Sequence, residues 1–233
     1  MEDDMNIEPV VDSRTDGNAA FATGFWSSLF VTALGASYFV VILATLLTGN
    51  FKLPPPEFVQ IYAAIMDLLL CPALVMVIAS IYFIVPKEKK IFAQIGLIFA
   101  SIFTAMVTMN RFIQISVVRL SVKEGDLEGL QRFLPYDSRS VMFALEIFGF
   151  GFFLSLALFF AAVALPAMTL LRKVKVTFFV YALLGMICTV GYVMNSLVVN
   201  VGFVAWGLVL YIGTAFLARF FYESRKKMNM PRI

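Results

Sequence analysis

Six long runs of apolar residues constrain this chain more than any other feature of its sequence. A helix needs about 20 residues to cross the hydrocarbon core of a bilayer, which is roughly 30 Å thick. Of the 233 residues, 61% are hydrophobic and 14% are charged, whereas an average soluble domain has about 25% charged residues. The sequence therefore predicts an all-α polytopic membrane protein, a bundle of six transmembrane helices, with spans near residues 25–47, 59–85, 91–118, 140–165, 174–196 and 202–222.

The segments outside these runs are short, so we expect residues 25–222 to form a single membrane domain. Residues 1–24 hold six acidic side chains and few apolar ones, a composition that predicts a disordered acidic tail. A cleavable signal peptide is not expected, because its first residues would be basic. Residues 223–233 form a basic tail at the other end of the chain.

Lysine and arginine gather on one side of the predicted bundle. Twelve of the 18 lie in the two tails, in the second and fourth loops or at the span ends next to them, and five lie in the first and third loops. Because cytoplasmic loops carry the excess of Lys and Arg, we expect both termini in the cytoplasm and the protein in the cytoplasmic membrane. Membrane lipids are the expected partners, and the formal net charge of +3 gives no reason to expect a nucleic-acid partner.

Three charged side chains lie at a similar depth inside the runs. At 1.5 Å per residue, Asp67 lies about 12 Å and Glu146 about 9 Å from the outer start of its helix, and Arg111 lies about 30 Å along a helix that starts inside. An unpaired charge in hydrocarbon costs about 3 kcal/mol on insertion scales. We therefore predict that Arg111 pairs with Glu146, with Asp67 as the second candidate.

Uncharged polar residues lie at a similar depth to the three charged side chains. Asn110 and Gln114 flank Arg111 one turn apart, and Tyr192 and Asn195 share one side of the fifth run near its outer end. We predict that Asn110, Gln114 and Asn195 complete a hydrogen-bonded network around Arg111. Two interpretations stay open: polar contacts that fix helix register, or an outward-facing pocket for a small molecule, a lipid headgroup or a coupling proton.

The loop of residues 119–140 is the only long linker between runs. Its apolar side chains share one helical face, and a proline ends the pattern: Leu127, Leu130, Phe133, Leu134 and Pro135. This pattern predicts a short amphipathic helix near residues 126–134 on the outer surface. Such a helix would either cover a pocket or lie in the lipid interface.

Several chemistries are excluded by composition. The chain has no histidine, which excludes metal centres that use imidazole and bis-histidine haem. It has no nucleotide-binding glycine loop and no GxSxG motif. Cys71 and Cys188 lie in separate runs and are expected to be small core residues. We therefore assign no catalytic residue, no metal site and no cofactor.

Four short motifs follow one another between Asn110 and Gly151. They are Asn-x-Phe-Ile-Gln-x-x-Val-Val, Asp-Leu-Glu-Gly-Leu, Pro-Tyr-Asp, and Ala-Leu-Glu before a glycine-rich stretch. This segment resembles a family of small uncharacterised multi-span membrane proteins of bacteria and archaea. The resemblance implies the following matching positions: Phe112, Gln114, Glu128, Tyr136 and Glu146. Arg111 departs from the family pattern, which has an aromatic residue there, and the resemblance implies no activity.

These observations leave three hypotheses about function. The first is a non-enzymatic protein with an outward-facing intramembrane polar pocket that binds or transports a small molecule or lipid. The second is a membrane enzyme that acts on a lipid, with Glu146 or Asp67 as general acid or base. The third is a structural or assembly partner of another membrane protein. The sequence predicts no oligomeric state.

Overall fold

The structure is all-α in the part of the chain that it describes. The computed structural model describes residues 14–49, 55–134 and 139–228. All regular structure in these three stretches is helical, and six helical spans there are long and apolar enough to cross a membrane. The prediction of an all-α bundle of six transmembrane helices is confirmed.

Three spans are single α-helices, and the other three each contain a π-helical segment. The single helices are α1 (Arg14–Leu47), α2 (Glu57–Ile84) and α7 (Thr169–Val193). The third span consists of α3 (Lys90–Ile113), a π-helical segment (Gln114–Val118) and α4 (Arg119–Glu124). The fourth consists of α5 (Val141–Ile147), a π-helical segment (Phe148–Phe153) and α6 (Leu154–Ala164). The sixth consists of a 3-10 turn (Leu197–Asn200), α8 (Val201–Val204), a π-helical segment (Ala205–Val209) and α9 (Leu210–Met228).

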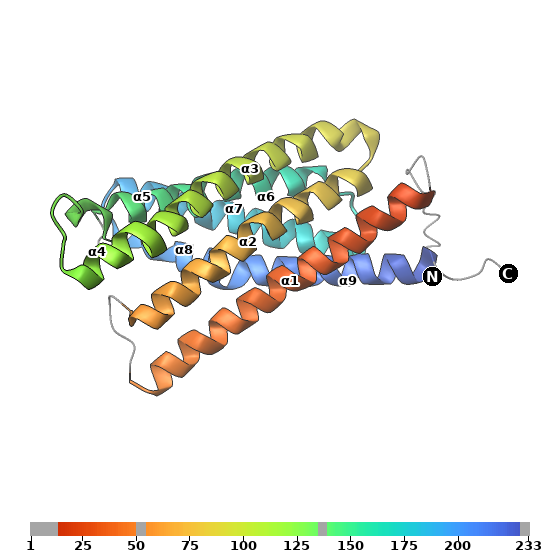
Figure 1. Ribbon diagram of the computed structural model, residues 1–233. Coiled ribbons are helices and arrows are strands. Elements are labelled where there is room, and N and C mark those ends of the chain that lie inside the picture. The colour runs from red at the N-terminus through yellow and green to blue at the C-terminus, as the bar shows by residue number, and fades with distance from the viewer. Residues whose placement is uncertain (1–13, 50–54, 135–138, 229–233) are drawn as a thin grey trace.

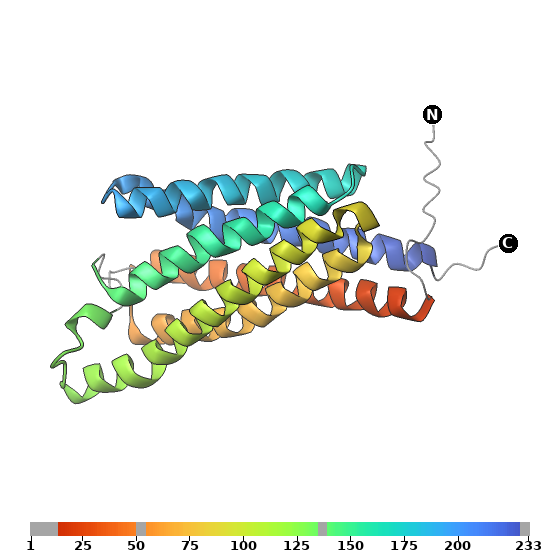
Figure 2. The same cartoon turned by 90° about the horizontal axis from the view of Figure 1, so that it is seen from above.

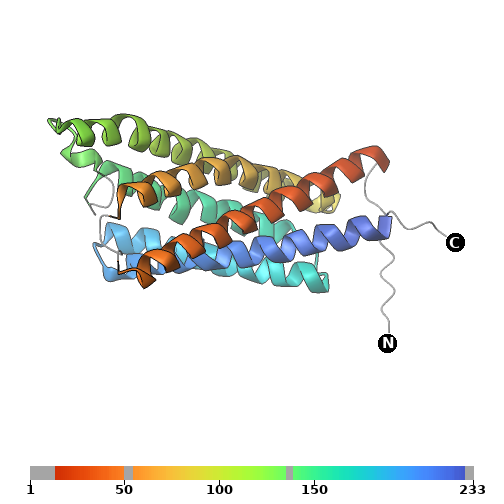
Figure 3. The same ribbon diagram turned by 60° about the horizontal axis from the view of Figure 1, so that its bottom comes forward.

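The six spans form a closed ring in chain order. Each span packs against the span before it and the span after it, and α1 packs against α9 to close the ring. Figures 1 and 3 show α1 and α9 side by side, with the start of α1 and the end of α9 at the same end of the bundle. The fourth span and α7 lie close together at that end and diverge toward the other (Figure 2).

Small residues let the spans approach closely inside the ring. A Cβ atom on Gly96 of α3 would lie 2.9 Å from the carbonyl oxygen of Ala157 in α6. Ala157 is itself fully buried, as are Ala161 and Ala162 one turn further along α6. Large apolar side chains remain exposed on the outside of the ring, Leu183 among them. An apolar outer surface over a close-packed interior suits contact with lipid chains.

Several spans extend beyond the predicted ends. The third span continues to Glu124 and the sixth to Met228, and α1 begins at Arg14, inside the tail for which the sequence predicts disorder. The start of α1 is held by aromatic packing, because the Phe21 ring lies edge-on to the Phe221 ring of α9 at a centroid distance of 5.8 Å. Residues 1–13, the rest of the predicted disordered tail, lie outside the described residues.

The prediction of an amphipathic helix near residues 126–134 is wrong. After α4 the chain turns at Gly125, with φ 77°, and again at Gly129, with φ 76°, and only a 3-10 turn follows, Gln131–Phe133. Left-handed backbone at Gly129 interrupts the helical path that the spacing of the leucines suggested. Pro135, the predicted stop, lies outside the described residues.

Candidate functional site

Arg111 is the centre of a charged cluster that joins three spans. Arg111 lies near the end of α3, Asp67 in α2 and Glu146 in α5. Nε and Nη2 of Arg111 each lie 2.7 Å from Oδ2 of Asp67, and Nη2 also lies 2.7 Å from Oε1 of Glu146. The predicted contact with Glu146 is therefore present, and so is the contact with the second candidate, Asp67.

A chain of amide side chains holds the guanidinium from the other side. Nη1 of Arg111 donates to Oε1 of Gln114 at 3.0 Å, and Nε2 of Gln114 donates to Oδ1 of Asn110 at 3.1 Å. Nδ2 of Asn110, which is 1% exposed, donates to the carbonyl oxygen of Met142 in α5 at 3.0 Å. These contacts match the roles predicted for Asn110 and Gln114 in the network. Each side chain in this series donates a hydrogen bond to the next group, from Arg111 to the carbonyl of Met142.

The guanidinium lies deeper than the two carboxylates. The side chain of Arg111 is 7% exposed, whereas those of Asp67 and Glu146 are 17% and 25% exposed. Two carboxylates share one guanidinium, so the formal charges leave one negative charge in excess. The second oxygen of each carboxylate, Oδ1 of Asp67 and Oε2 of Glu146, has no hydrogen-bond partner among the described residues.

Glycine in the fourth span makes this contact possible. A Cβ atom on Gly149 would lie 2.8 Å from Cγ2 of Val107 in α3. Any larger residue at position 149 would push the fourth span away from α3. Glu146 precedes Gly149 by one turn of the same span, so the close approach of the backbones brings its carboxylate within reach of Arg111.

Two of the three π-helical segments begin beside the charged cluster. Gln114–Val118 starts at a residue of the network, and Phe148–Phe153 starts two residues after Glu146. A π-helical turn holds one extra residue and so rotates the following helix about its axis. These segments therefore set which face of the third and fourth spans turns toward the interior at this level.

Tyrosines from α1 and α9 lie within electrostatic range of the carboxylates. Tyr38 is close enough to interact electrostatically with all three charged groups, and Tyr211 with Asp67, Tyr38 and Tyr62. The ring of Tyr211 packs on Gly35 of α1, where a larger residue would collide with it. The sequence patterns do not reveal Tyr38 and Tyr211, because an isolated tyrosine in an apolar run gives no signal of the neighbours that ring closure brings to it.

The ring of Tyr192, in α7, packs edge-on against that of Phe143, in α5, at a centroid distance of 5.7 Å. It lines an apolar groove of about 350 Å³ between the fourth span and α7. The groove is lined by Val141, Ala144, Leu145, Ile147, Phe148, Thr189, Tyr192 and Val193. Its lining includes none of the three charged residues.

The role predicted for Asn195 in the polar network is wrong. Because α7 ends at Val193, Asn195 lies in the turn that follows, with an exposed side chain and φ 51°. Its backbone N–H donates to the carbonyl oxygen of Tyr192 at 3.0 Å. Asparagine tolerates left-handed backbone better than most residues, so its role here is to form the turn.

The described residues contain no group of three or more His, Cys, Asp or Glu side chains that could hold a metal ion. Cys71 and Cys188 are both free and fully buried. The possible chemistry of the site is therefore that of Asp67, Glu146 and Arg111 with their amide and phenol neighbours.

A comparison of the chain with family models, with curated proteins and with solved structures finds no match. The resemblance carried by residues 110–151 stays an expectation. A proposal about function therefore rests on the chemistry of the charged cluster.

Proposed function

We propose that this protein binds an organic cation at Asp67 and Glu146, and that this binding is one step in moving the cation across the cytoplasmic membrane. The observation that supports the proposal is that both carboxylates share one guanidinium. An excess negative charge in an apolar span attracts a cation or a proton more strongly than the same charge does in water.

The guanidinium of Arg111 is already bound by neighbouring side chains. We therefore expect a ligand to bind to the two carboxylates. Its Nε contacts Asp67, its Nη1 contacts Gln114, and its Nη2 contacts both carboxylates. An anionic ligand would have to displace these contacts and approach two negative charges. A cation would instead approach the unpartnered oxygens, on the two side chains of the cluster that are more exposed.

The neighbouring tyrosines favour an organic cation over a metal ion. Tyr38 and Tyr211 lie within electrostatic range of Asp67 and come from two different spans. The face of an aromatic ring attracts cations, quaternary ammonium groups included. A cation with apolar surface also loses less hydration on entering a protein interior than a small metal ion does.

The placement of the basic residues gives the proposed direction of access. By the positive-inside rule, the end of the bundle where α1 begins and α9 ends faces the cytoplasm, together with the basic loop Lys87–Lys90. Asp67, Arg111 and Glu146 lie in the opposite half of the bundle. The ligand would therefore enter from the outer side.

A pair of probes with one shape and opposite charge tests the proposal. The full chain in lipid nanodiscs is titrated with tetraphenylphosphonium and, separately, with tetraphenylborate, and partitioning into empty nanodiscs is subtracted. We expect saturable binding of the cation alone. The Glu146→Gln variant keeps the size of the side chain and an acceptor oxygen, and it should bind the cation at least about tenfold more weakly, a loss of roughly 1.4 kcal/mol.

Glu57→Gln is the matched control, because Glu57 forms an exposed ion pair with Arg119 at 2.8 Å, away from the cluster. This variant should bind tetraphenylphosphonium as the wild type does. In proteoliposomes, uptake of the cation, after subtraction of its passive entry into protein-free liposomes, should follow the same order among the three proteins. Equal binding of both probes, or unchanged binding in Glu146→Gln, would refute the proposal.

A further inference from the structure

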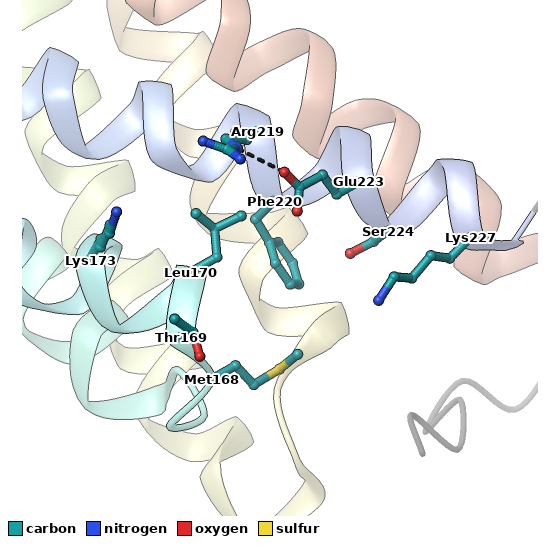
Figure 4. A pocket seen from close by; sticks show the side chains of 9 residues that line it. All are labelled: Met168, Thr169, Leu170, Lys173, Arg219, Phe220, Glu223, Ser224 and Lys227. Carbon is teal, nitrogen blue, oxygen red and sulfur yellow. Dashed lines mark hydrogen bonds and ion pairs between the residues drawn. The ribbon is translucent and has the colours of Figure 1, made fainter. Parts of the chain in front are cut away.

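A second groove lies at the opposite end of the bundle from the charged cluster. It has a volume of about 310 Å³ and lies between the start of α7 and the last turns of α9 (Figure 4). It is lined by Met168, Thr169, Leu170, Lys173, Arg219, Phe220, Glu223, Ser224 and Lys227. None of these residues takes part in the proposed cation site.

The groove combines an apolar floor with a basic rim. Figure 4 shows Leu170 and Phe220 between the amine-bearing side chains of Lys173 and Lys227. Arg219 is neutralised within the groove, because its Nε donates to Oε1 of Glu223 at 2.7 Å. The two lysines therefore supply the net positive charge of the groove.

Neither lysine forms an ion pair with a carboxylate in the described part of the chain. Nζ of Lys173 lies 5.5 Å from the centre of the Phe216 ring, which holds this side chain against α9. Both lysines are exposed. Their amines are free to donate hydrogen bonds to an anion that lies over the apolar floor.

We propose that this groove binds the phosphate headgroup of an anionic membrane phospholipid, with Lys173 and Lys227 on the phosphate and Leu170 and Phe220 under the first carbons of the lipid. The proposal is independent of the cation site. Two features favour a lipid over free phosphate. The groove offers apolar contact that a free phosphate cannot use, and it lies where the apolar spans end and basic residues gather, which is the level of lipid headgroups.

The test uses short-chain lipids that dissolve as monomers. The full chain in neutral detergent is titrated with dihexanoyl phosphatidylglycerol, dihexanoyl phosphatidylcholine and inorganic phosphate, and binding is followed by calorimetry. The groove variant is Lys173→Gln with Lys227→Gln. The control variant, Arg172→Gln with Lys226→Gln, removes the same charge from neighbouring residues that do not line the groove.

We expect phosphatidylglycerol to bind the wild type and the control variant alike. Each lysine near an anionic headgroup contributes roughly fivefold to binding, so the groove variant should bind about 25-fold more weakly. Should the double variant lose thermal stability, the two single variants carry the test, with roughly fivefold losses each.

Three results would overturn the proposal. Equal losses of phosphatidylglycerol binding in the groove and control variants would show that the positive charge of this end of the bundle as a whole attracts the lipid. Equal binding of phosphatidylcholine would show that the net charge of the headgroup is not recognised. Binding of inorganic phosphate as tight as that of phosphatidylglycerol would assign the groove to free phosphate.

Discussion

Replacing Arg111 by glutamine is expected to destabilise the protein far more than replacing either of its partners. The change removes the contacts at 2.7 Å to both carboxylates and leaves two like charges facing each other between two apolar spans. Removing one partner of a buried ion pair costs about 3–5 kcal/mol. Because Asp67 and Glu146 are 17% and 25% exposed, partial hydration reduces this penalty, and we expect the lower end, about 3 kcal/mol.

Glu146→Gln should cost about 1 kcal/mol or less. The amide oxygen can still accept a hydrogen bond from Nη2 of Arg111, whose charge remains paired with Asp67. The loss is then close to the net value of one hydrogen bond. A triple variant that also carries Asp67→Asn and Arg111→Gln has no charge left in the cluster, and it should recover about 2 kcal/mol relative to Arg111→Gln alone.

Unfolding of the purified protein in mixed micelles, with increasing amounts of a denaturing detergent, measures these differences in the free energy of unfolding. Thermal unfolding provides a second measure. For a chain of this size, 1 kcal/mol corresponds to roughly 2–4 °C, so Arg111→Gln should lower the midpoint by about 6–12 °C and Glu146→Gln by at most about 4 °C. If Arg111→Gln is no more destabilising than Glu146→Gln, the guanidinium does not hold the cluster together and the proposed balance of charges is wrong.

Three further predictions concern packing, capping and the cysteines. Gly96→Ala should cost about 1–3 kcal/mol, because its Cβ would lie 2.9 Å from a backbone oxygen of α6. Gly207→Ala is its control and should cost little, because no atom lies within 4 Å of its Cβ. Ser140→Ala should cost about 1 kcal/mol in unfolding experiments, since its Oγ accepts from a backbone N–H of α5 at 3.0 Å. Cys71 and Cys188, both 0% exposed, should react with a maleimide only after unfolding; rapid labelling of the folded protein would contradict the close packing around both thiols.

The fold could be predicted from the sequence, because the length of a hydrophobic run decides whether it can form a membrane-spanning helix. Each predicted span overlaps an observed one; the first, residues 25–47, overlaps Asn18–Leu47, and the last, residues 202–222, overlaps Leu197–Met228. The exact ends of the spans were harder to predict. A helix that leaves the bilayer no longer has an apolar signal, and whether it continues depends on tertiary contacts such as Phe21 on Phe221.

Part of the candidate site followed from a simple electrostatic requirement. A charged side chain in hydrocarbon needs a partner, and the carboxylates at matching depth, on Asp67 and Glu146, are the partners found for Arg111. The same reasoning failed for Asn195, because depth alone does not separate the last turn of a helix from the turn that follows it. It also missed Tyr38, which comes within electrostatic range of Asp67 because α1 packs against α2.

The charge count bears on whether Glu146 has a structural role or the binding role proposed for it. A guanidinium that only had to be neutralised would need one carboxylate, and Asp67 alone supplies it through Nε and Nη2. Glu146 adds a second negative charge that must be held against the repulsion of the first. A residue kept against its own electrostatic cost is typical of a site selected for function rather than stability. The variant Glu146→Gln should therefore lose little stability and most of the binding of tetraphenylphosphonium; a large loss of stability with intact binding would reverse this assignment and make Glu146 a structural residue.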